Sequence, residues 1–146
     1  ANIIEVPMGF LTHIQYVAKE YVVKNGAHLI PFGGDHPIIV QAMCEVAKSL
    51  DVNPKEVWSV MSSGVLSRGL QLAWPEAIVY GVKIGHNTKK QEQGTARCFR
   101  SKYKFQQKCK KIERPPFPSS LTYDSKAWSF IKEKATKGSL FWNVGK

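Results

Sequence analysis

The stretch that decides the fold is Val57-Trp58-Ser59-Val60-Met61-Ser62-Ser63-Gly64-Val65-Leu66-Ser67-Arg68-Gly69-Leu70. It begins with a short apolar run, which is typical of a buried strand, and its later part opens a helix. Ser-Ser-Gly between the two marks a tight turn that leads directly from strand to helix. A strand that runs directly into a helix is the repeating unit of a parallel sheet.

Strand-like and helix-like segments alternate outside this stretch as well. The predicted helices are Leu11–Lys24, Pro37–Leu50, Ser67–Ala73 and Ser125–Ala135. The predicted strands are Ile3–Val6, Ala27–Phe32, Glu56–Met61, Ala77–Ile84 and Ser139–Val144. We therefore predict an α/β fold with a mostly parallel sheet and helices on both faces, a three-layer α/β/α arrangement.

Length and composition indicate one globular domain over residues 1–146, since 43% of the residues are hydrophobic and 22% are charged. Three cysteines without a CxxC pair and four scattered histidines argue against a disulfide framework and against a metal centre. No apolar run is long enough for a membrane span, and the N-terminus lacks the pattern of a signal peptide. We expect a protein of the reducing cytoplasm, without a membrane partner.

The positive charge is concentrated in a basic insertion at residues 88–118. Thr88–Arg114 holds ten Lys or Arg against two Glu, a net of +8 out of +10 for the whole chain. Phe99, Tyr103 and Phe105 are interleaved with these residues, a pattern suited to phosphate contacts and base stacking. The alternative is a solvated and mobile insertion. The residues predicted to bind DNA or another polyanion are Arg97, Arg100, Lys102, Lys104, Lys108, Lys110 and Lys111.

Three loops are candidates for a ligand site at the carboxyl ends of the strands. At Ser62–Leu66, backbone N–H groups and a helix N-terminus could hold an anion, although an ordinary capped turn explains the same residues. The Gly33-Gly34-Asp35 loop could approach a ligand closely, or be a tight turn capped by Asp35. Tyr123 and Asp124 could face a site, or Asp124 could cap the helix that follows.

Taken together, these motifs resemble the later part of pyridoxal-phosphate enzymes of fold type II, the tryptophan-synthase-β type. Within that type they are most similar to the branch of aminocyclopropane-carboxylate deaminase and D-cysteine desulfhydrase. The matched motifs are IPFGGxxP at Leu29–Pro37, GSGGT-x-x-GL at Ser62–Leu70, VYxGKA at Thr122–Ala127 and vLFxxTGG at Leu140–Gly145. Val65 and Leu66 replace the second Gly and the Thr of the family's phosphate loop. The resemblance spans Ile3–Gly145 and is weakest in the basic insertion.

The resemblance implies the large-domain part of such an enzyme, with pyridoxal 5'-phosphate as cofactor. It implies that Ser62, Ser63, Gly64, Val65 and Leu66 hold the cofactor phosphate. It places Asp124 near the pyridine nitrogen, where a carboxylate keeps the nitrogen protonated. It places Tyr123 near the substrate as an acid or base, and Gly33, Gly34 and Asp35 in a loop beside the site.

The family carries its Schiff-base lysine in an N-terminal region, upstream of the matched part. Three explanations stay open: a fragment of a longer enzyme, one piece of a split protein, or a reduced relative without pyridoxal chemistry. We favour the fragment, because a sheet that starts on a mid-protein strand lacks its central partners. A missing N-terminal portion or a homodimer would supply them.

Three functions follow. The first is lyase, deaminase or decarboxylase chemistry, dependent on pyridoxal phosphate, on an amino-acid-like substrate. The second is nucleic-acid binding through the basic insertion. The two combine if the amino-acid group is attached to nucleic acid, as in phage DNA base modification in the host cytoplasm. The third is a small interaction module that keeps the fold without the cofactor.

Overall fold

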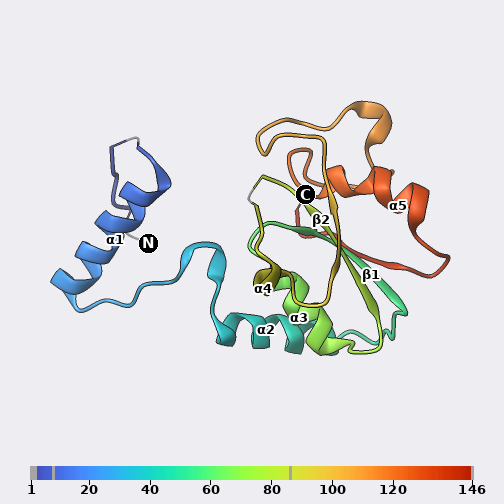
Figure 1. Ribbon diagram of the computed structural model, residues 1–146, viewed down its shortest axis with the longest axis horizontal. Helices are drawn as coiled ribbons and strands as arrows, with labels where there is room; N and C mark the ends of the chain where they lie inside the picture. The colour runs from blue at the N-terminus through green and yellow to red at the C-terminus, as the bar shows by residue number, and fades with distance from the viewer. Residues whose placement is uncertain (1–2, 8, 86, 146) are drawn as a thin grey trace. The chain divides into compact units, whose positions relative to one another are not determined.

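The computed structural model describes residues 3–7, 9–85 and 87–145 (Figure 1). The chain divides into two compact units, Ala1–Gly34 and Asp35–Lys146. The boundary falls inside the span that was predicted as one domain.

The first unit contains the predicted helix but neither of the predicted strands. Helix α1 covers Leu11–Asn25 and ends at Gly26, whose φ of 59° gives the left-handed cap expected of Asn-Gly. A short 3₁₀ turn, η1, covers Phe32–Gly34. Ile3–Val6 and Ala27–Phe32 are not strands. The strand predictions were wrong because an apolar run forms a strand only beside another strand, and the described residues of this unit contain none.

The second unit is built on a four-stranded parallel sheet with the order β3-β2-β1-β4. Its strands are β1 at Glu56–Met61, β2 at Ile78–Lys83, β3 at Arg97–Arg100 and β4 at Leu140–Trp142. All six residues of β1 are buried, as expected for a central strand of a parallel sheet covered on both faces. The strand predicted at Glu56–Met61 is therefore confirmed at both ends.

Helices cover both faces of this sheet, which confirms the predicted α/β class (Figure 1). On one face, helices α2 (Pro37–Lys48) and α3 (Val65–Ala73) pack on β1 and β2. On the other face, η3 (Asp124–Ala127) and α5 (Trp128–Lys134) pack against Trp58, Val60 and Val82. A Cβ atom on Gly69 would lie 2.5 Å from the Cβ of Met43, so this glycine lets α3 approach α2 closely.

The connections explain why the helices lie on two faces. The chain moves from β1 to β2 through α3 and on to β3 through the short helix α4 (Lys90–Gln93). It then returns across the sheet to β4, beside β1, through η2 (Lys111–Glu113), η3 and α5. Because crossovers between parallel strands are right-handed, a reversal of direction moves the connection to the opposite face. The order of strands therefore reverses between β1 and β4, and ligands bind at such points in open α/β sheets.

Strand β3 lies inside the basic insertion and was not predicted from the sequence. Arg97 and Arg100 are exposed at its two ends, and β3 forms one edge of the sheet. Edge strands tolerate charged side chains, which protect the open edge from further pairing. In the part of the chain that the structure describes, no helix is both long and apolar enough to cross a membrane.

Candidate functional site

A cavity of about 210 Å³ lies at the carboxyl ends of β1 and β4, at the point where the strand order reverses. Its walls combine the Ser62–Gly64 turn with apolar side chains. The lining residues are Met43, Val60, Ser62, Ser63, Gly64, Leu66, Ser67, Tyr123, Trp142 and Val144. The fold thus brings Ser62–Gly64 and Leu66 together with Tyr123, whereas Val65 and Asp124, which were predicted for the same site, are not among the lining residues.

The turn after β1 requires glycine at residue 64. Gly64 has a φ of 81° and is the N-cap residue of α3. A Cβ atom there would lie 1.9 Å from the backbone oxygen of Glu92 in α4. Both the backbone conformation and the contact therefore exclude a side chain. Because the first N–H groups of a helix have no partner within it, α3 presents donors suited to an anion at this turn.

Residues of the basic insertion form hydrogen bonds with this turn and with the helix that follows it. Thr88 is buried and donates a hydrogen bond of 2.9 Å from Oγ1 to the backbone oxygen of Ser62. Gln71 of α3 donates from Nε2 to the backbone oxygen of Gln93 at 2.9 Å. Residues 88–93 are therefore part of the support of the site.

Asp124 is fully buried, and its two carboxylate oxygens have different surroundings. Its Oδ2 accepts a hydrogen bond of 2.8 Å from the backbone N–H of Gly145, which follows β4. Its Oδ1 has no hydrogen-bond partner among the described residues. Burial raises the pKa of Asp124 above its ordinary value, and the backbone N–H groups of Gly145, Val144 and Asp124 act against that rise. The side chain forms no cap on the following helix, so the capping interpretation of Asp124 was wrong.

Tyr123 precedes Asp124 and lines the cavity. Burial raises the pKa of its hydroxyl, and the neighbouring Asp124 adds to the effect. Its ring meets that of Phe105 edge to face, with the centroids 6.4 Å apart. A neutral phenol beside the Ser62–Gly64 turn can donate a proton, and only its ionised form can accept one. The role of Tyr123 as an acid or base stays a prediction.

The three residues predicted for a second loop have different surroundings. Gly33 and Gly34 belong to the first unit, with φ values of 71° and 66°. Their place beside the site stays a prediction. Asp35 belongs to the second unit and forms an ion pair with Arg68 of α3. His36, and not Asp35, caps α2, because its Nδ1 accepts a hydrogen bond from the N–H of Ile38, so the cap prediction for Asp35 was wrong.

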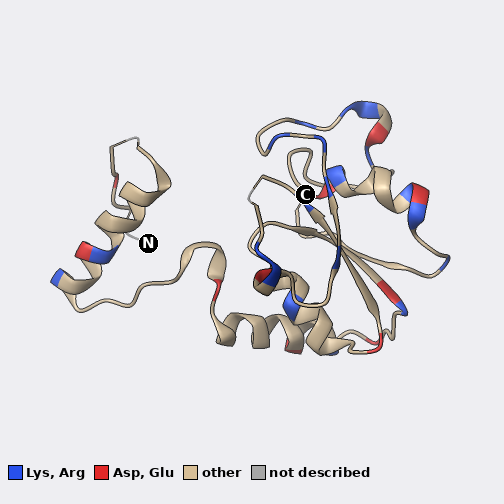
Figure 2. Ribbon diagram, viewed as in Figure 1, with Lys and Arg blue, Asp and Glu red and all other residues tan. Residues whose placement is uncertain are grey.

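The basic residues predicted to bind polyanions do not form one cluster (Figure 2). Arg100, Lys102 and Lys104 line a second pocket at the carboxyl ends of β2 and β3, while Arg97 lies at the start of β3. Lys108 and Lys110 are exposed on the segment before η2, and Lys111 is exposed at the start of η2. Direct hydrogen bonds fix the loop that carries them: Lys126 is buried, and its Nζ donates to the backbone oxygens of Lys104 and Phe105 at 2.8 and 2.7 Å.

Sequence reasoning missed several residues of the site. Met43 and Trp142 reach the cavity from α2 and β4, and an apolar residue in a helix or strand carries no signal of such a role. Lys126 was placed in the VYxGKA motif without a function. Among residues 3–7, 9–85 and 87–145, no group of three or more His, Cys, Asp or Glu could hold a metal ion.

The chain has a recognisable structural relative. No family model and no curated protein matches it. Among solved structures it is similar to a protein described as an ACC deaminase homologue, with a TM-score of 0.69 and 17% sequence identity. The similarity covers 92% of this chain and 54% of the other, so this chain spans about half the length of that protein. At this identity the likeness shows the fold alone.

Proposed function

We propose that the chain contributes to an enzyme that depends on pyridoxal phosphate and acts on an amino-acid-like substrate. The observation that carries the proposal is Asp124 Oδ1, a carboxylate oxygen that is buried and has no partner among the described residues. A buried carboxylate oxygen without a hydrogen bond costs free energy, and the N–H of a protonated ring nitrogen would supply that hydrogen bond. The similarity to an ACC deaminase homologue supports the same proposal through the fold.

The glycine turn at Gly64 lines the cavity, and together with the N-terminus of α3 it suits a phosphate. Asp124 is not among the lining residues, but it follows Tyr123, which does line the cavity, and its carboxylate would suit the ring nitrogen. Val65 and Leu66 still offer backbone N–H groups, although they remove the hydroxyl that the family motif carries at this turn. When bound, the cofactor supplies an electron sink for charge that develops on the substrate.

The chain's own residues would bind, orient and transfer protons. Asp124 would fix the ring orientation and keep the ring nitrogen protonated. Tyr123, with its raised pKa, would stay protonated at neutral pH and donate a proton to the substrate. Met43, Trp142 and Val144 would exclude water from the cavity. Whether the reaction is of the lyase, deaminase or decarboxylase type depends on the substrate.

The test is binding of 4-deoxypyridoxine 5'-phosphate, which lacks the aldehyde and cannot react with lysines. Calorimetry of the purified protein should show binding of this analogue and much weaker binding of 4-deoxypyridoxine without the phosphate. Asp124→Asn should weaken binding about tenfold, because it replaces a charged hydrogen bond by a neutral one.

The matched control is Glu133→Gln, which removes one carboxylate charge from the exposed end of α5, where the side chain is 69% exposed. It should leave binding unchanged. No binding of the analogue, or equal losses in the two variants, would contradict the proposal.

We further propose that the amino-acid group is attached to nucleic acid, as in a phage pathway of DNA base modification. The support is the positive charge of Thr88–Arg114, which carries a net of +8. This segment also lies beside the cavity, because its Thr88 forms a hydrogen bond with the Ser62–Gly64 turn. Turnover on a polymer substrate should fall when Lys104, Lys108 and Lys111 are replaced by Gln. Unchanged turnover would exclude it.

A second function, nucleic-acid binding without catalysis, is favoured by one observation. Exposed Lys108 lies between buried Tyr103 and buried Cys109, and exposed Lys110 and Lys111 directly follow Cys109. A titration of labelled single-stranded DNA by the protein distinguishes the two functions. Binding that depends on salt, together with no binding of the cofactor analogue, would favour this second function.

A further inference from the structure

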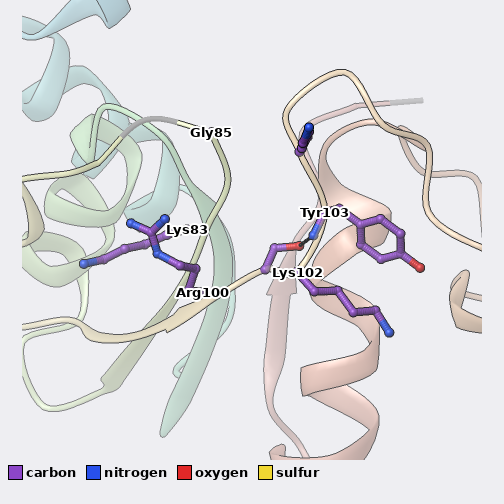
Figure 3. A pocket seen from close by; sticks show the side chains of 7 residues that line it. Lys83, Gly85, Arg100, Lys102 and Tyr103 are labelled. Atoms are coloured by element: carbon purple, nitrogen blue, oxygen red, sulfur yellow. Dashed lines mark hydrogen bonds between the residues drawn. The ribbon is translucent and has the colours of Figure 1, made fainter.

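A second pocket, of about 250 Å³, lies at the carboxyl ends of β2 and β3 (Figure 3). Four of its lining residues are cationic, and no carboxylate lines it. The residues are Lys83, Gly85, Arg100, Ser101, Lys102, Tyr103 and Lys104. Its position resembles that of the first cavity, since both lie where parallel strands end.

Lys83 and Arg100 form the centre of this positive charge. They are direct neighbours in the register of β2 and β3, and Figure 3 shows both side chains on the same side of these strands. Like charges placed opposite one another on adjacent strands destabilise a sheet. Neither side chain forms an ion pair with an acid within the described residues. Nη2 of Arg100 donates to Oδ1 of Asn87 at 2.5 Å, which orients the guanidinium without neutralising it.

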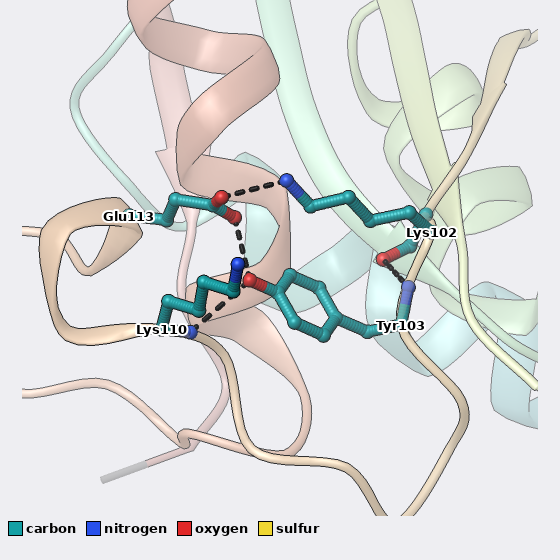
Figure 4. A network of polar contacts seen from close by, with 5 residues as sticks. Lys102, Tyr103, Lys110 and Glu113 are labelled. Atoms are coloured by element: carbon teal, nitrogen blue, oxygen red, sulfur yellow. Dashed lines mark hydrogen bonds and ion pairs between the residues drawn. The ribbon is translucent and has the colours of Figure 1, made fainter.

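Lys102, in contrast, already has its partner (Figure 4). Its Nζ lies 2.6 Å from Oε1 of Glu113, and the hydroxyl of Tyr103 donates to Oε2 of Glu113 at 2.8 Å. The hydrogen bond to Glu113 raises the pKa of Lys102, and Lys102 together with Tyr103 lowers the pKa of Glu113. This network joins residues 102 and 113 and neutralises Lys102, whereas Lys83, Arg100 and Lys104 form no ion pair within the described residues. Of these three, Lys83 and Arg100 are the two that face each other in the sheet.

The pocket is linked to the first cavity by two aromatic rings. Gly85 lines the pocket, and a Cβ atom on it would lie 2.8 Å from Cδ2 of Phe105. The ring of Phe105 in turn contacts Tyr123, which lines the first cavity. A ligand that occupies the cavity at Tyr123 therefore has a cationic pocket as its neighbour.

We propose that Lys83 and Arg100 form a binding site for a phosphate group. Arginine binds phosphate through two parallel hydrogen bonds, and lysine adds a point charge. A bound dianion or diester would also remove the repulsion between the two cations. The phosphate site is independent of the proposed function. Only the further statement that this phosphate belongs to the substrate depends on the proposed function.

The experiment compares two double variants that each remove two positive charges. Lys83→Gln/Arg100→Gln alters the pocket, and Lys132→Gln/Lys137→Gln alters two exposed lysines on α5 and the loop after it. The ligand is a fluorescein-labelled single strand of about ten nucleotides, a length within the usual site size for such strands. Inorganic phosphate and thymidine 5'-monophosphate serve as competitors, and unfolding curves confirm that both variants fold.

The pocket variant should weaken binding about tenfold or more, and the control less than about twofold, since direct phosphate contacts exceed long-range attraction. Lys83→Arg should retain binding because it keeps the charge. Competition by the monophosphate at concentrations where inorganic phosphate fails indicates a nucleotide ligand, and competition only by unlabelled strand indicates a polymer. No binding at low salt, or equal losses in the two double variants, would overturn the proposal.

Binding of 4-deoxypyridoxine 5'-phosphate separates this proposal from the proposed function. The pocket variant should bind the analogue as the unaltered protein does. If the pocket variant no longer bound the analogue either, the pocket would bind the cofactor and the inference would be wrong. If the unaltered protein bound the strand but not the analogue, the phosphate site would stand and the proposed enzyme would fail.

Discussion

Two buried carboxylates, one at each end of the sheet, have opposite surroundings. Glu56 lies at the amino end of β1 and accepts hydrogen bonds from Trp58, Thr136 and Ser139. Asp124 lies beside the carboxyl ends of β1 and β4, and one of its oxygens has no partner among the described residues. Burial raises the pKa of both, but at Glu56 the hydrogen bonds outweigh burial and the pKa is lowered.

The difference indicates which end of the sheet is structural and which is a site. A satisfied buried carboxylate joins elements that are distant in sequence, here β1 and the turn before β4. An unsatisfied one costs free energy and persists where a ligand completes it. The amino end of this sheet therefore stabilises the fold, and the carboxyl end is where we propose that a ligand binds.

The largest effect on stability is expected at the amino end. Glu56→Ala removes the acceptor for the indole N–H of Trp58 and for the backbone N–H and hydroxyl of Thr136. Buried donors left without acceptors should lower the free energy of unfolding by about 3 kcal/mol. Urea denaturation measures this. The protein that remains folded should bind 4-deoxypyridoxine 5'-phosphate as the unaltered protein does. A loss of this binding would contradict the separation of a structural amino end of the sheet from a ligand-binding carboxyl end.

A smaller stability effect is expected at the carboxyl end. Gly64→Ala places a side chain at a φ of 81° and against the backbone of Glu92, so the turn or α4 must shift. We expect a loss of about 2 kcal/mol in the free energy of unfolding, together with loss of analogue binding. Gly138→Ala is the control, because Gly138 has a φ of 86° but a Cβ atom there meets nothing within 4 Å. Equal effects on binding from both variants would contradict the role of the Gly64 turn.

A substitution at Lys126 tests whether the hydrogen bonds of this side chain fix the loop at residues 103–109. Its buried ammonium donates to two backbone oxygens, and burial lowers its pKa. Lys126→Met removes these hydrogen bonds but also the cost of burying a charge, so we expect a loss of only about 1 kcal/mol. Hydrogen exchange should become faster in residues 103–109. Unchanged exchange would show that the loop is fixed by other contacts.

The smallest expected effect is a change in the free energy of unfolding with pH. Glu56 and Asp124 should contribute to this change with opposite signs. The pKa of Glu56 is lowered in the fold, so its contribution is present above its ordinary value of 4.5 and is lost as pH falls through the folded value. The pKa of Asp124 is raised, so its contribution is present below its ordinary value of 3.8 and is lost as pH rises through the folded value.

These signs can be measured by unfolding Glu56→Gln, Asp124→Asn and the unaltered protein between about pH 3 and 7, across the ordinary range of these groups. The destabilisation caused by Glu56→Gln should shrink as pH falls. Asp124→Asn should gain stability relative to the unaltered protein as pH rises. The same sign for both variants would contradict the different surroundings assigned to the two groups.

Much of the sheet could be predicted because its central strands are apolar on both faces. Glu56–Met61 has this property, and α3 and β2 follow it with clear helix and strand patterns. The same reasoning failed at Ile3–Val6 and Ala27–Phe32, because the described residues place no strand beside these apolar runs. It also missed β3, because the charged residues of an edge strand look like a loop.

Part of the candidate site could also be predicted, because glycine and paired polar residues at strand ends carry a local signal. Gly64 and Tyr123 were named from the sequence, and the structure brings both to one cavity. Lys83 was not assigned to any site. Its neighbour Arg100 lies far along the chain, and only the register of β2 and β3 places the two cations together.

The sequence by itself determined the α/β class, the turn after β1 and the concentration of charge in Thr88–Arg114, because these depend on local pattern and composition. Only the tertiary structure decided which groups are satisfied. Glu56 and Asp124 are both single acidic residues beside apolar ones in the sequence. Burial and hydrogen bonding act across distant segments. The contacts of Thr136 and Ser139 with Glu56 therefore satisfy one carboxylate, whereas the contact of Gly145 with Asp124 leaves one oxygen of the other without a partner among the described residues.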